Sequence, residues 1–309
     1  MVEVSVVIPT YNQRDVLKKA LECLFQQDYP KDRYEIIVVD DGSTDGTKEM
    51  INSLFPPCRL VYLRQNRKGP HIARNLGIKN AWGKIVIFID SDIFVPPNFI
   101  NEHMRFHRRF KDVVVSGPTV RTDNLKDVFK DIKKRKFRES LAWSGPSLIT
   151  SNLSVKREFL LKVGGFDEDF VGMGWHDWEL GLRLKKLGLK VKRNVEAIVY
   201  HYNRKRKLSD IPSLCEKGKE RGINAVLYYK KHPGLKVKLG IRTHTLLFSK
   251  LIWWIDNDFG KRLLSSAEKR GNQFLLNLLI ECKLNYVYAQ GLKEGMRKYK
   301  VKLLPWIQV

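Results

Sequence analysis

Cysteines are few in this 309-residue sequence, and long apolar runs are missing. The four cysteines (Cys23, Cys58, Cys215 and Cys282) have neither the paired spacing of a zinc site nor the density of a disulfide framework. This usage favours a reducing compartment. No run of about 18 apolar residues occurs, so we expect no transmembrane helix. The start, Met1 to Ile8, has no basic region before its apolar run, so we expect no signal peptide and a cytoplasmic protein.

Acidic residues are also in the minority. The chain has 33 Asp and Glu against 57 Lys and Arg, for a net charge of +24, and residues 206–309 alone carry 8 acidic and 21 basic residues. This excess favours an anionic partner such as nucleic acid, an anionic membrane or a phosphorylated substrate. For any single basic run, a solvated surface is the simpler explanation.

The first half alternates short β-branched runs with amphipathic segments. We predict strands at Val4–Ile8, Glu35–Val39, Leu60–Leu63, Ile85–Ile89 and Val113–Val115, and helices at Asp15–Gln26, Asp45–Phe55 and Pro70–Lys79. This order predicts an α/β domain with a mainly parallel sheet flanked by helices. After the basic run 203–207 the pattern becomes helical. We therefore predict a domain at 1–205 and a basic, mainly helical region at 206–309.

Carboxylates follow two of the predicted strands. Asp40 and Asp41 come after the second, and Asp90 and Asp92 come after the fourth. Ligands of parallel sheets bind at the carboxyl ends of the strands, so these acids should share one edge. Residues two apart in extended chain project to the same side, which allows Asp90 and Asp92 to share a divalent ion such as Mg²⁺ or Mn²⁺.

The segment from Asp40 to Gly46 has alternative interpretations. It partly resembles a calcium loop, but Asn52 stands where that loop needs a glutamate. It also resembles a helix start, with Ser43 or Thr44 as N-cap. The helix start leaves Asp40 and Asp41 available to a base or a ribose.

Phosphate binding must use other groups, because neither a Walker-type loop nor Gly-x-Gly-x-x-Gly after a strand is present. Lys68 and Arg74 supply positive charge beside Gly69-Pro70, which opens a predicted helix. The N-terminus of a helix favours anions.

Five motifs together resemble glycosyltransferase family 2 with the GT-A (Rossmann-like) fold. They cover about residues 4–205 and are listed here in order: Val7-Ile-Pro-Thr-Tyr-Asn12, Val38-Val-Asp-Asp-Gly-Ser-Thr-Asp-Gly-Thr47, Gly69-Pro-His-Ile-Ala-Arg-Asn-Leu-Gly-Ile78, Ile89-Asp-Ser-Asp92, and the pair Gly164-Gly-Phe-Asp-Glu168 with His176-Asp-Trp-Glu-Leu-Gly-Leu-Arg-Leu184. The resemblance implies an inverting, metal-dependent hexosyl- or N-acetylhexosaminyltransferase. Its donor would be a nucleoside-diphosphate sugar, with UDP favoured.

The resemblance also implies roles for single residues. The nucleotide-binding set is Pro9, Tyr11, Asp40, Asp41, Lys68, Arg74 and Asp90. Asp92 and Asp90 would hold Mn²⁺ or Mg²⁺, and His201 stands where related enzymes often place a further ligand. Asp177 falls at the general base, although His176 replaces the acid that usually precedes it. A structural role for Asp177, as a helix cap, remains the alternative.

The acceptor is expected to be a glycan or a lipid-linked sugar, as in polysaccharide biosynthesis. Trp175, His176 and Trp143 are the candidates for acceptor binding, with core packing as the alternative for the tryptophans. We expect no specific nucleic acid, because no nucleic-acid-binding motif occurs. A catalytically inactive binding protein and a nucleotidyltransferase are the competing functions.

The basic helical tail has three candidate roles. Thr243–Ile255 places aromatic and aliphatic residues beside Arg242 and Lys250, a pattern that suits an anionic membrane interface. This would attach the protein peripherally to the inner face of the cell membrane. Packing on the catalytic domain and a homodimer surface are the other two roles.

Overall fold

The computed structural model describes residues 1–123 and 148–303, which divide into two compact units. The first unit takes its described residues from Met1–Glu168 and Asp177–Arg204. The second takes them from Asp169–His176 and Lys205–Val309. Residues 169–176, which the sequence analysis grouped with 1–205, therefore pack with the second unit.

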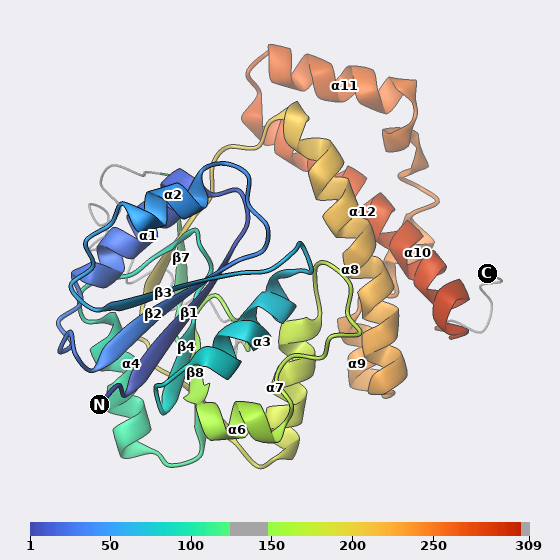
Figure 1. Cartoon of the computed structure of the whole chain (residues 1–309). Coiled ribbons are helices and arrows are strands. Elements are labelled where there is room, and N and C mark those ends of the chain that lie inside the picture. Colours follow the sequence, from blue (N-terminus) through green and yellow to red (C-terminus); the bar gives the residue numbers. More distant parts are fainter. Residues whose placement is uncertain (124–147, 304–309) are drawn as a thin grey trace. The chain divides into compact units, whose positions relative to one another are not determined.

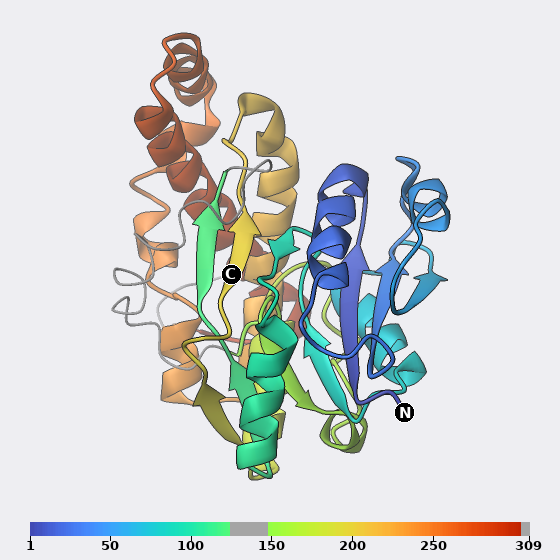
Figure 2. The ribbon, with the colours of Figure 1, turned by 90° about the vertical axis from the view of Figure 1, so that its left-hand side faces the viewer.

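Within the described part of the first unit, seven strands form the main sheet, in the order β3-β2-β1-β4-β8-β6-β9 (Figures 1 and 2). The strands are β1 Val4–Thr10, β2 Tyr34–Asp40, β3 Arg59–Arg64, β4 Ile85–Phe88, β6 Val113–Ser116, β8 Leu153–Lys156 and β9 Lys190–Arg193. β1 to β4 are mutually parallel, and β6 is parallel to β9. Only β8 runs antiparallel to its neighbours in this sheet of described strands. The mainly parallel sheet is thus confirmed.

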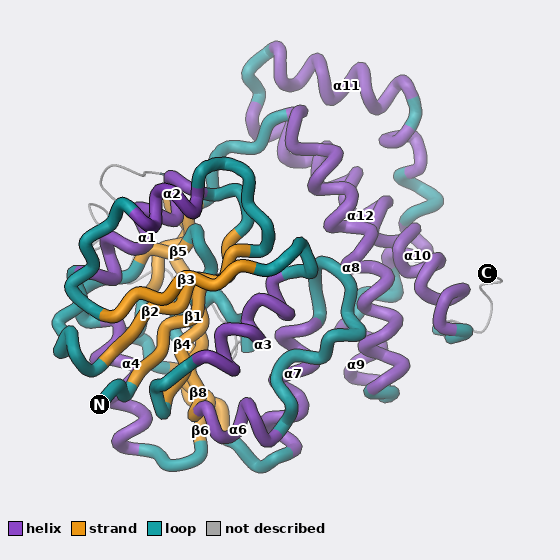
Figure 3. Tube along the Cα trace, viewed as in Figure 1, coloured by secondary structure: helices purple, strands orange, loops and turns teal. Residues whose placement is uncertain are grey.

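The apolar strands are buried because helices cover both faces of this sheet (Figure 3). Val6 and Ile8 of β1 pack into a core with α1 (Arg14–Phe25), α2 (Thr47–Asn52) and α4 (Phe99–Arg109). Val7, on the opposite face, packs into a second core with α3 (Pro70–Asn80), α6 (Arg157–Lys162) and α7 (His176–Lys186). Alternation along a strand sends successive side chains to opposite faces, so a continuous Val/Ile run fills both cores.

A smaller sheet brings together segments that are far apart in the sequence. It contains β5 (Ile93–Phe94), β10 (Val199–Tyr202) and β7 (Thr119–Thr122), in the order β5-β10-β7. His201 lies opposite Ile93 in the antiparallel β5–β10 pair. His201 is therefore part of strand β10, which begins at Val199.

The described part of the second unit is helical. Its elements are η1 Leu208–Asp210, α8 Ile211–Lys231, α9 Leu235–Gly240, α10 Thr245–Phe248, η2 Trp253–Asp256, α11 Asp258–Lys269 and α12 Gln273–Tyr299. α8 and α12 pack closely at two glycines: a Cβ on Gly222 would lie 2.3 Å from the Tyr288 carbonyl oxygen, and one on Gly291 2.2 Å from that of Lys219. No helix of the described residues is long and apolar enough to cross a membrane.

Candidate active site

The ends of β1, β2 and β4 lie side by side and carry the first group of predicted site residues. Thr10 pairs with Asp40 in the β1–β2 register, and the Asp41 amide donates to the Thr10 carbonyl at 2.8 Å. On the other side of β1, the Ile89 amide donates to the Val7 carbonyl at 3.3 Å. The residues that follow β4, including Asp90, are therefore level with Pro9. The parallel register alone brings these segments to one edge of the sheet.

Asp41 fixes the loop that leads to α3. Its carboxylate accepts hydrogen bonds from the backbone amides of Lys68 and Gly69, at 2.7 and 2.9 Å, and from the Gln65 side chain at 2.7 Å. These donors hold the loop before α3 against β2. The Lys68 side chain itself is exposed and remains available to a ligand.

Asp40 has two local partners. Its carboxylate accepts from the Ser43 amide at 2.7 Å and from the Tyr62 hydroxyl at 2.6 Å. Burial and the neighbouring Asp40 charge raise the pKa of Tyr62, so its hydroxyl stays protonated and donates. Both aspartates are buried, and their oxygens shape the loops around the site.

The predicted N-cap at Ser43 or Thr44 is wrong. Helix α2 begins at Thr47, and its N-cap is Gly46 with φ +84°. The Ser43 hydroxyl instead accepts a hydrogen bond from the Asn12 amide at 2.9 Å. Asp45 bonds the Thr47 hydroxyl at 2.5 Å. The left-handed backbone at position 46 moves the start of the helix to Thr47. Glycine adopts this backbone conformation readily because it lacks a Cβ.

Tyr11 lies at the surface beside this loop. Its ring is partly exposed, and the Arg67 guanidinium stands 4.6 Å from the ring centroid. Pro9, by contrast, is buried at the end of β1. An aromatic ring with one cationic neighbour at the end of β1 is suited to contact a planar base.

Arg74 of α3 forms an ion pair with Asp90. The arginine side chain is buried, and its Nε and Nη1 groups have no hydrogen-bond partner among the described residues. Burial raises the pKa of Asp90, Arg74 lowers it, and the charges of Asp92 and Asp177 raise it further. Asp90 therefore lies within electrostatic range of two other acids, one of them 87 positions later in the sequence.

Asp92 meets His201 rather than Asp90. The Asp92 carboxylate is 3.2 Å from His201 Nε2, and the Tyr202 amide donates to the Asp92 carbonyl at 2.9 Å. The hydrogen bond to Asp92 raises the pKa of His201. The β5–β10 pairing therefore brings together two of the three predicted metal ligands.

The third predicted ligand, Asp90, faces Arg74. Across 1–123 and 148–303, no group of three or more His, Cys, Asp or Glu side chains is arranged to hold a metal ion. One carboxylate and one imidazole at 3.2 Å nevertheless fit Mn²⁺. Such an ion commonly takes its remaining ligands from substrate phosphates and water.

Asp177 lies in the first turn of α7 and is bonded to the segment before β8. Its carboxylate accepts from the Thr150 hydroxyl at 2.9 Å and from the Thr150 amide at 3.3 Å. Leu180 and Leu184 of the same helix are buried in the second core. These contacts fix the helix that carries Asp177 beside the sheet.

The predicted acceptor residues are placed differently. Trp175, with φ +70°, stacks on Tyr228 at 5.5 Å, and its Nε1 donates to the Arg221 carbonyl at 2.9 Å. His176 is buried, whereas Trp178 is half exposed. Trp143 lies outside the described residues. Trp175 thus has a packing role within the second unit, and its acceptor role stays a prediction.

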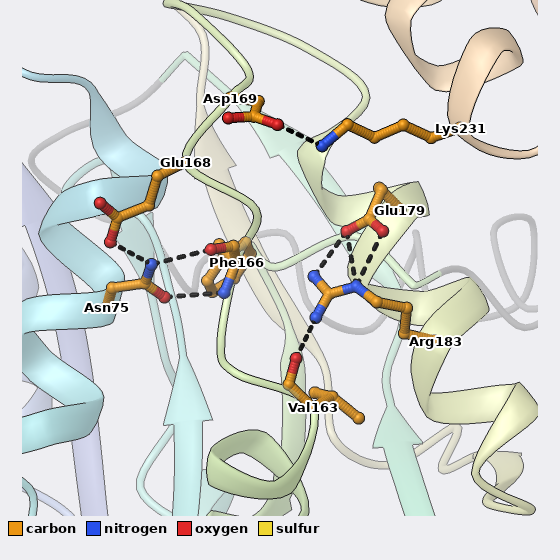
Figure 4. A network of polar contacts seen from close by, with 8 residues as sticks. All are labelled: Asn75, Val163, Phe166, Glu168, Asp169, Glu179, Arg183 and Lys231. Atoms are coloured by element: carbon orange, nitrogen blue, oxygen red, sulfur yellow. Dashed lines mark hydrogen bonds and ion pairs between the residues drawn. The ribbon is translucent and has the colours of Figure 1, made fainter.

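Asn75 is a residue of this region that the sequence analysis did not single out (Figure 4). Its side chain donates to the Phe166 carbonyl and to Glu168, both at 2.9 Å, and accepts from the Phe166 amide at 2.7 Å. Glu179 and Arg183 of α7 are also paired, and Arg183 donates to the Val163 carbonyl. Together they fix the 163–168 loop between α3 and α7. Asn75 directly follows Arg74 in the motif from Gly69 to Ile78, and this position is the indication of a role that the sequence offers.

Asp169 and Lys231 form a separate pair at 2.6 Å within the second unit (Figure 4).

Comparison with known proteins gives one dominant match. A family model described as glycosyl transferase family 2 matches residues 5–164, and a second, described as the N-terminal domain of galactosyltransferase, matches residues 135–206. An uncharacterized glycosyltransferase, YfnE, of Bacillus subtilis is 27% identical over 95% of this chain and 86% of its own length. A glucuronosyltransferase of Methanococcus voltae, named for a dolichyl N-acetylglucosaminyl phosphate, is 26% identical over 96% of this chain and 99% of its own.

Solved structures show the same fold. The mannosyltransferase PcManGT from Pyrobaculum calidifontis, in complex with GDP-Man and Mn²⁺, has a TM-score of 0.62 and 18% identity, and covers 96% of this chain and 87% of its own. Residues 1–349 of TarS from S. aureus, in complex with UDP-GlcNAc, have a TM-score of 0.52 and 17% identity over 95% of this chain and 92% of their own. At these identities the likeness concerns the fold.

Proposed function

The chain belongs to glycosyl transferase family 2, and we propose that it moves a sugar from a nucleoside-diphosphate sugar to an acceptor hydroxyl with inversion at the sugar carbon. One observation carries the proposal: the parallel register brings the ends of β1, β2 and β4 to one edge, where the buried Arg74 pairs with Asp90 and Asp92 lies 3.2 Å from His201. Arg74 beside Asp90 can neutralise the diphosphate of the donor. Asp177 is a separate carboxylate, and it can serve as the base.

The donor would lie along the ends of β1, β2 and β4. The base and ribose would be bordered by Tyr11, Pro9, Asp40 and Asp41. The phosphates would lie near Lys68 and Arg74. The buried Nε and Nη1 groups of Arg74 lack partners in the described structure, which makes them available donors for diphosphate oxygens. Positive groups placed where charge develops on a leaving group stabilise the transition state.

A divalent ion, Mn²⁺ or Mg²⁺, held by Asp92 and His201 with Asp90 close by, would neutralise charge on the departing diphosphate. Asp92 is already 3.2 Å from the imidazole that would share the ion. His201 would have to be neutral for this, because only the neutral imidazole has a lone pair free for the ion, so protons and the ion would compete for it.

Asp177 would accept the proton of the acceptor hydroxyl. The first turn of α7 favours a negative charge, and the Thr150 hydroxyl fixes the orientation of the carboxylate. An inverting transfer needs a base and a leaving diphosphate on opposite sides of the sugar. Asp90 and Asp177 approach the site from β4 and α7, two different elements of the first unit.

The acceptor would be a glycan or a lipid-linked sugar, bound beside α7. One relative, the enzyme of Methanococcus voltae, is named for a lipid-linked sugar, dolichyl N-acetylglucosaminyl phosphate, and another, TarS of Staphylococcus aureus, is named for the polymer poly(ribitol-phosphate). Trp175, His176 and Trp143 remain the acceptor candidates, and the exposed ring of Trp178, one residue after Asp177, is also suited to stack on a sugar.

The test is a transfer assay with UDP-, GDP- and dTDP-sugars, with and without Mn²⁺, that measures release of the nucleoside diphosphate. We expect Mn²⁺-stimulated release, lost in Asp92→Ala and reduced about 10²–10⁴-fold in Asp177→Asn, the usual contribution of a general base. Asp112→Asn is the matched control, because Asp112 is an exposed acid that precedes β6 in the same unit. Full activity of Asp177→Asn would show that Asp177 is not the base. Turnover that does not depend on Mn²⁺ would show that no divalent ion is required.

A further inference from the structure

A long segment of the second unit has no acidic residue. Between Glu220 and Asp256 the chain contains seven Lys and Arg and neither Asp nor Glu. The basic residues in order are Arg221, Lys230, Lys231, Lys236, Lys238, Arg242 and Lys250. This segment includes the second half of α8, then α9 and α10, and reaches η2. Its charge is therefore of one sign over 35 consecutive residues.

The end of this segment exposes large apolar side chains. Leu247, Phe248, Leu251 and Trp253 are between 50% and 70% exposed. Backbone bonds from the Lys250 and Leu251 amides to the Leu247 and Phe248 carbonyls continue the turn of α10, so Leu247 and Leu251 lie on the same side. Thr245, Leu246 and Ser249 are buried on the other side.

Helix α9 repeats this pattern. Leu235 and Leu239, one turn apart, are 72% and 67% exposed, and Lys236 lies between them. Only four residues separate the end of α9 at Gly240 from the start of α10 at Thr245. An extended chain of that length spans at most about 17 Å, so the end of α9 and the start of α10 lie within that distance of each other. We call these six residues (Leu235, Leu239, Leu247, Phe248, Leu251 and Trp253) the α9–η2 surface.

Clustered exposed apolar side chains mark an interaction site on a soluble unit. The charges around them select the partner. Lys236 and Lys250 are both exposed and lie in sequence between residues of the α9–η2 surface, and the segment from 221 to 255 lacks acids. Apolar side chains that enter an interface, flanked by lysines at the level of the headgroups, match a bilayer that contains anionic lipid.

We propose that the α9–η2 surface docks the protein on an anionic lipid bilayer. Leu247, Phe248, Leu251 and Trp253 enter the boundary between headgroups and acyl chains, and Lys236 and Lys250 contact anionic headgroups. The inference deepens the proposed function, because a bilayer is where a lipid-linked acceptor lies, but bilayer binding itself requires no sugar transfer. The two can therefore be tested separately.

The experiment is co-sedimentation of the full chain with vesicles. Phosphatidylcholine vesicles that contain phosphatidylglycerol should bind the protein, added salt should weaken binding, and vesicles of phosphatidylcholine alone should bind it at least about tenfold more weakly. A Leu247→Ser/Leu251→Ser variant should bind anionic vesicles at least about tenfold more weakly, because two inserted apolar side chains are lost.

The matched control is Phe274→Ser/Leu278→Ser. Phe274 and Leu278 are an exposed pair one turn apart on α12 of the same unit, outside the α9–η2 surface and its basic segment. The control should bind as the unchanged protein does. Equal loss in the control, or unchanged binding of the Leu247/Leu251 variant, would overturn the proposal.

Charge and insertion have their own readouts. Lys236→Glu/Lys250→Glu should weaken binding to anionic vesicles at least about tenfold and leave the weak binding to phosphatidylcholine unchanged. Vesicles should shift tryptophan emission to the blue, and Trp253→Phe should remove most of that shift. No shift, or the same shift in Trp253→Phe, contradicts insertion at this surface.

The other occupant of such a surface is a second copy of the chain. A dimer in gel filtration that Leu247→Ser/Leu251→Ser dissociates would overturn the bilayer proposal. Nucleoside diphosphate release without vesicles measures the proposed function by itself. A variant that keeps this release but no longer binds vesicles is folded and specifically defective in docking.

Discussion

Arg74 and Asp90 form an ion pair between α3 and the end of β4, with the arginine side chain 5% exposed and the carboxylate 35% exposed. Only one of the guanidinium nitrogens reaches Asp90 in this pair, and two others have no partner among the described residues. Arg74 can therefore bind a second anion, next to the partly exposed Asp90, through its unused Nε and Nη1 donors. The diphosphate of the donor is the anion that we propose.

Arg74→Met tests this relationship. Loss of the charge and of the donors should lower kcat/KM for nucleotide-sugar turnover about 10²–10³-fold, the range found when a stabilising donor is removed. Arg74→Lys should not restore activity, because an ammonium cannot bond Asp90 and a phosphate in the planar geometry of a guanidinium. Steady-state kinetics checks both. Activity of Arg74→Met within about threefold of the unchanged enzyme would contradict the role.

His201→Ala tests the metal assignment. With the imidazole removed from Asp92, the Mn²⁺ concentration for half-maximal activity should rise at least about tenfold, because one ligand is missing from the site. Titration of activity against Mn²⁺ measures this. His107→Ala is the control, since His107 bonds Ser154 away from the acids. The same half-maximal concentration in both variants would remove His201 from the metal site.

Asn75→Ala should destabilise the first unit. Three hydrogen bonds of a buried side chain are lost, and the Phe166 amide and carbonyl are left without them, which costs about 1–3 kcal/mol. Urea unfolding measures the change. Asn80→Ala on the same helix is the matched control, because Asn80 is exposed and makes a single bond to the Leu76 carbonyl. Equal effects of the two substitutions would show that the hydrogen bonds from Asn75 to the 163–168 loop do not contribute to the free energy of unfolding.

Two neighbouring glycines separate backbone strain from crowding. Gly164 and Gly165 have φ of +78° and +73°, so alanine is strained by about 1 kcal/mol at either position. A Cβ on Gly165 would lie 2.4 Å from Asn75 Oδ1, whereas one on Gly164 meets nothing within 4 Å. Gly165→Ala should therefore lower the free energy of unfolding by about 1–3 kcal/mol more than Gly164→Ala. Equal losses in urea unfolding would contradict the crowding.

The stability of the first unit should fall in mild acid because of two histidines of α4, His103 and His107, which bond Ser154 of β8. Burial lowers the pKa of His103 to about 4 and that of His107 to about 3. The unfolded state then binds more protons than the folded state from about pH 6.5 down to these values, so stability is complete above pH 6.5 and is lost as the pH falls. For His103 the loss is about 3 kcal/mol, and unfolding at a series of pH values measures it.

His103→Gln should reduce this acid sensitivity, since glutamine keeps polar contact with Ser154 and Asn152 without titrating. His244→Gln, at an exposed histidine of the second unit, should keep the full sensitivity. Unchanged acid sensitivity of His103→Gln would assign the effect to other groups.

The strand pattern was readable because burial leaves a local record. Val4–Thr10 and Tyr34–Asp40 are apolar on both faces since two cores cover them, and the predicted strands fall within a residue or two of those observed. The place of Asp40, Asp41 and Asp90 at one edge followed from parallel order alone. The start of α2 did not follow, because the left-handed backbone at Gly46 outweighed the capping potential of Ser43.

Partners far apart in the chain could not be read from the sequence. The family resemblance suggested His201 as a further metal ligand, but nothing in the residues around Asp92 indicates that β10 returns 109 positions later to place His201 beside it, or that Asp90 pairs with Arg74. The packing of Trp175 on Tyr228 is likewise invisible, since a tryptophan next to a candidate base is equally suited to a sugar.

The sequence by itself determined the layered α/β architecture, the helical region after residue 205 and the edge of the sheet where the acids gather, because side-chain periodicity and strand order are local properties. The tertiary structure alone decided which acids pair with which cations, which aromatic rings are used in packing, and that residues 169–176 join the second unit. Those outcomes depend on distances between segments that only the folded chain brings together.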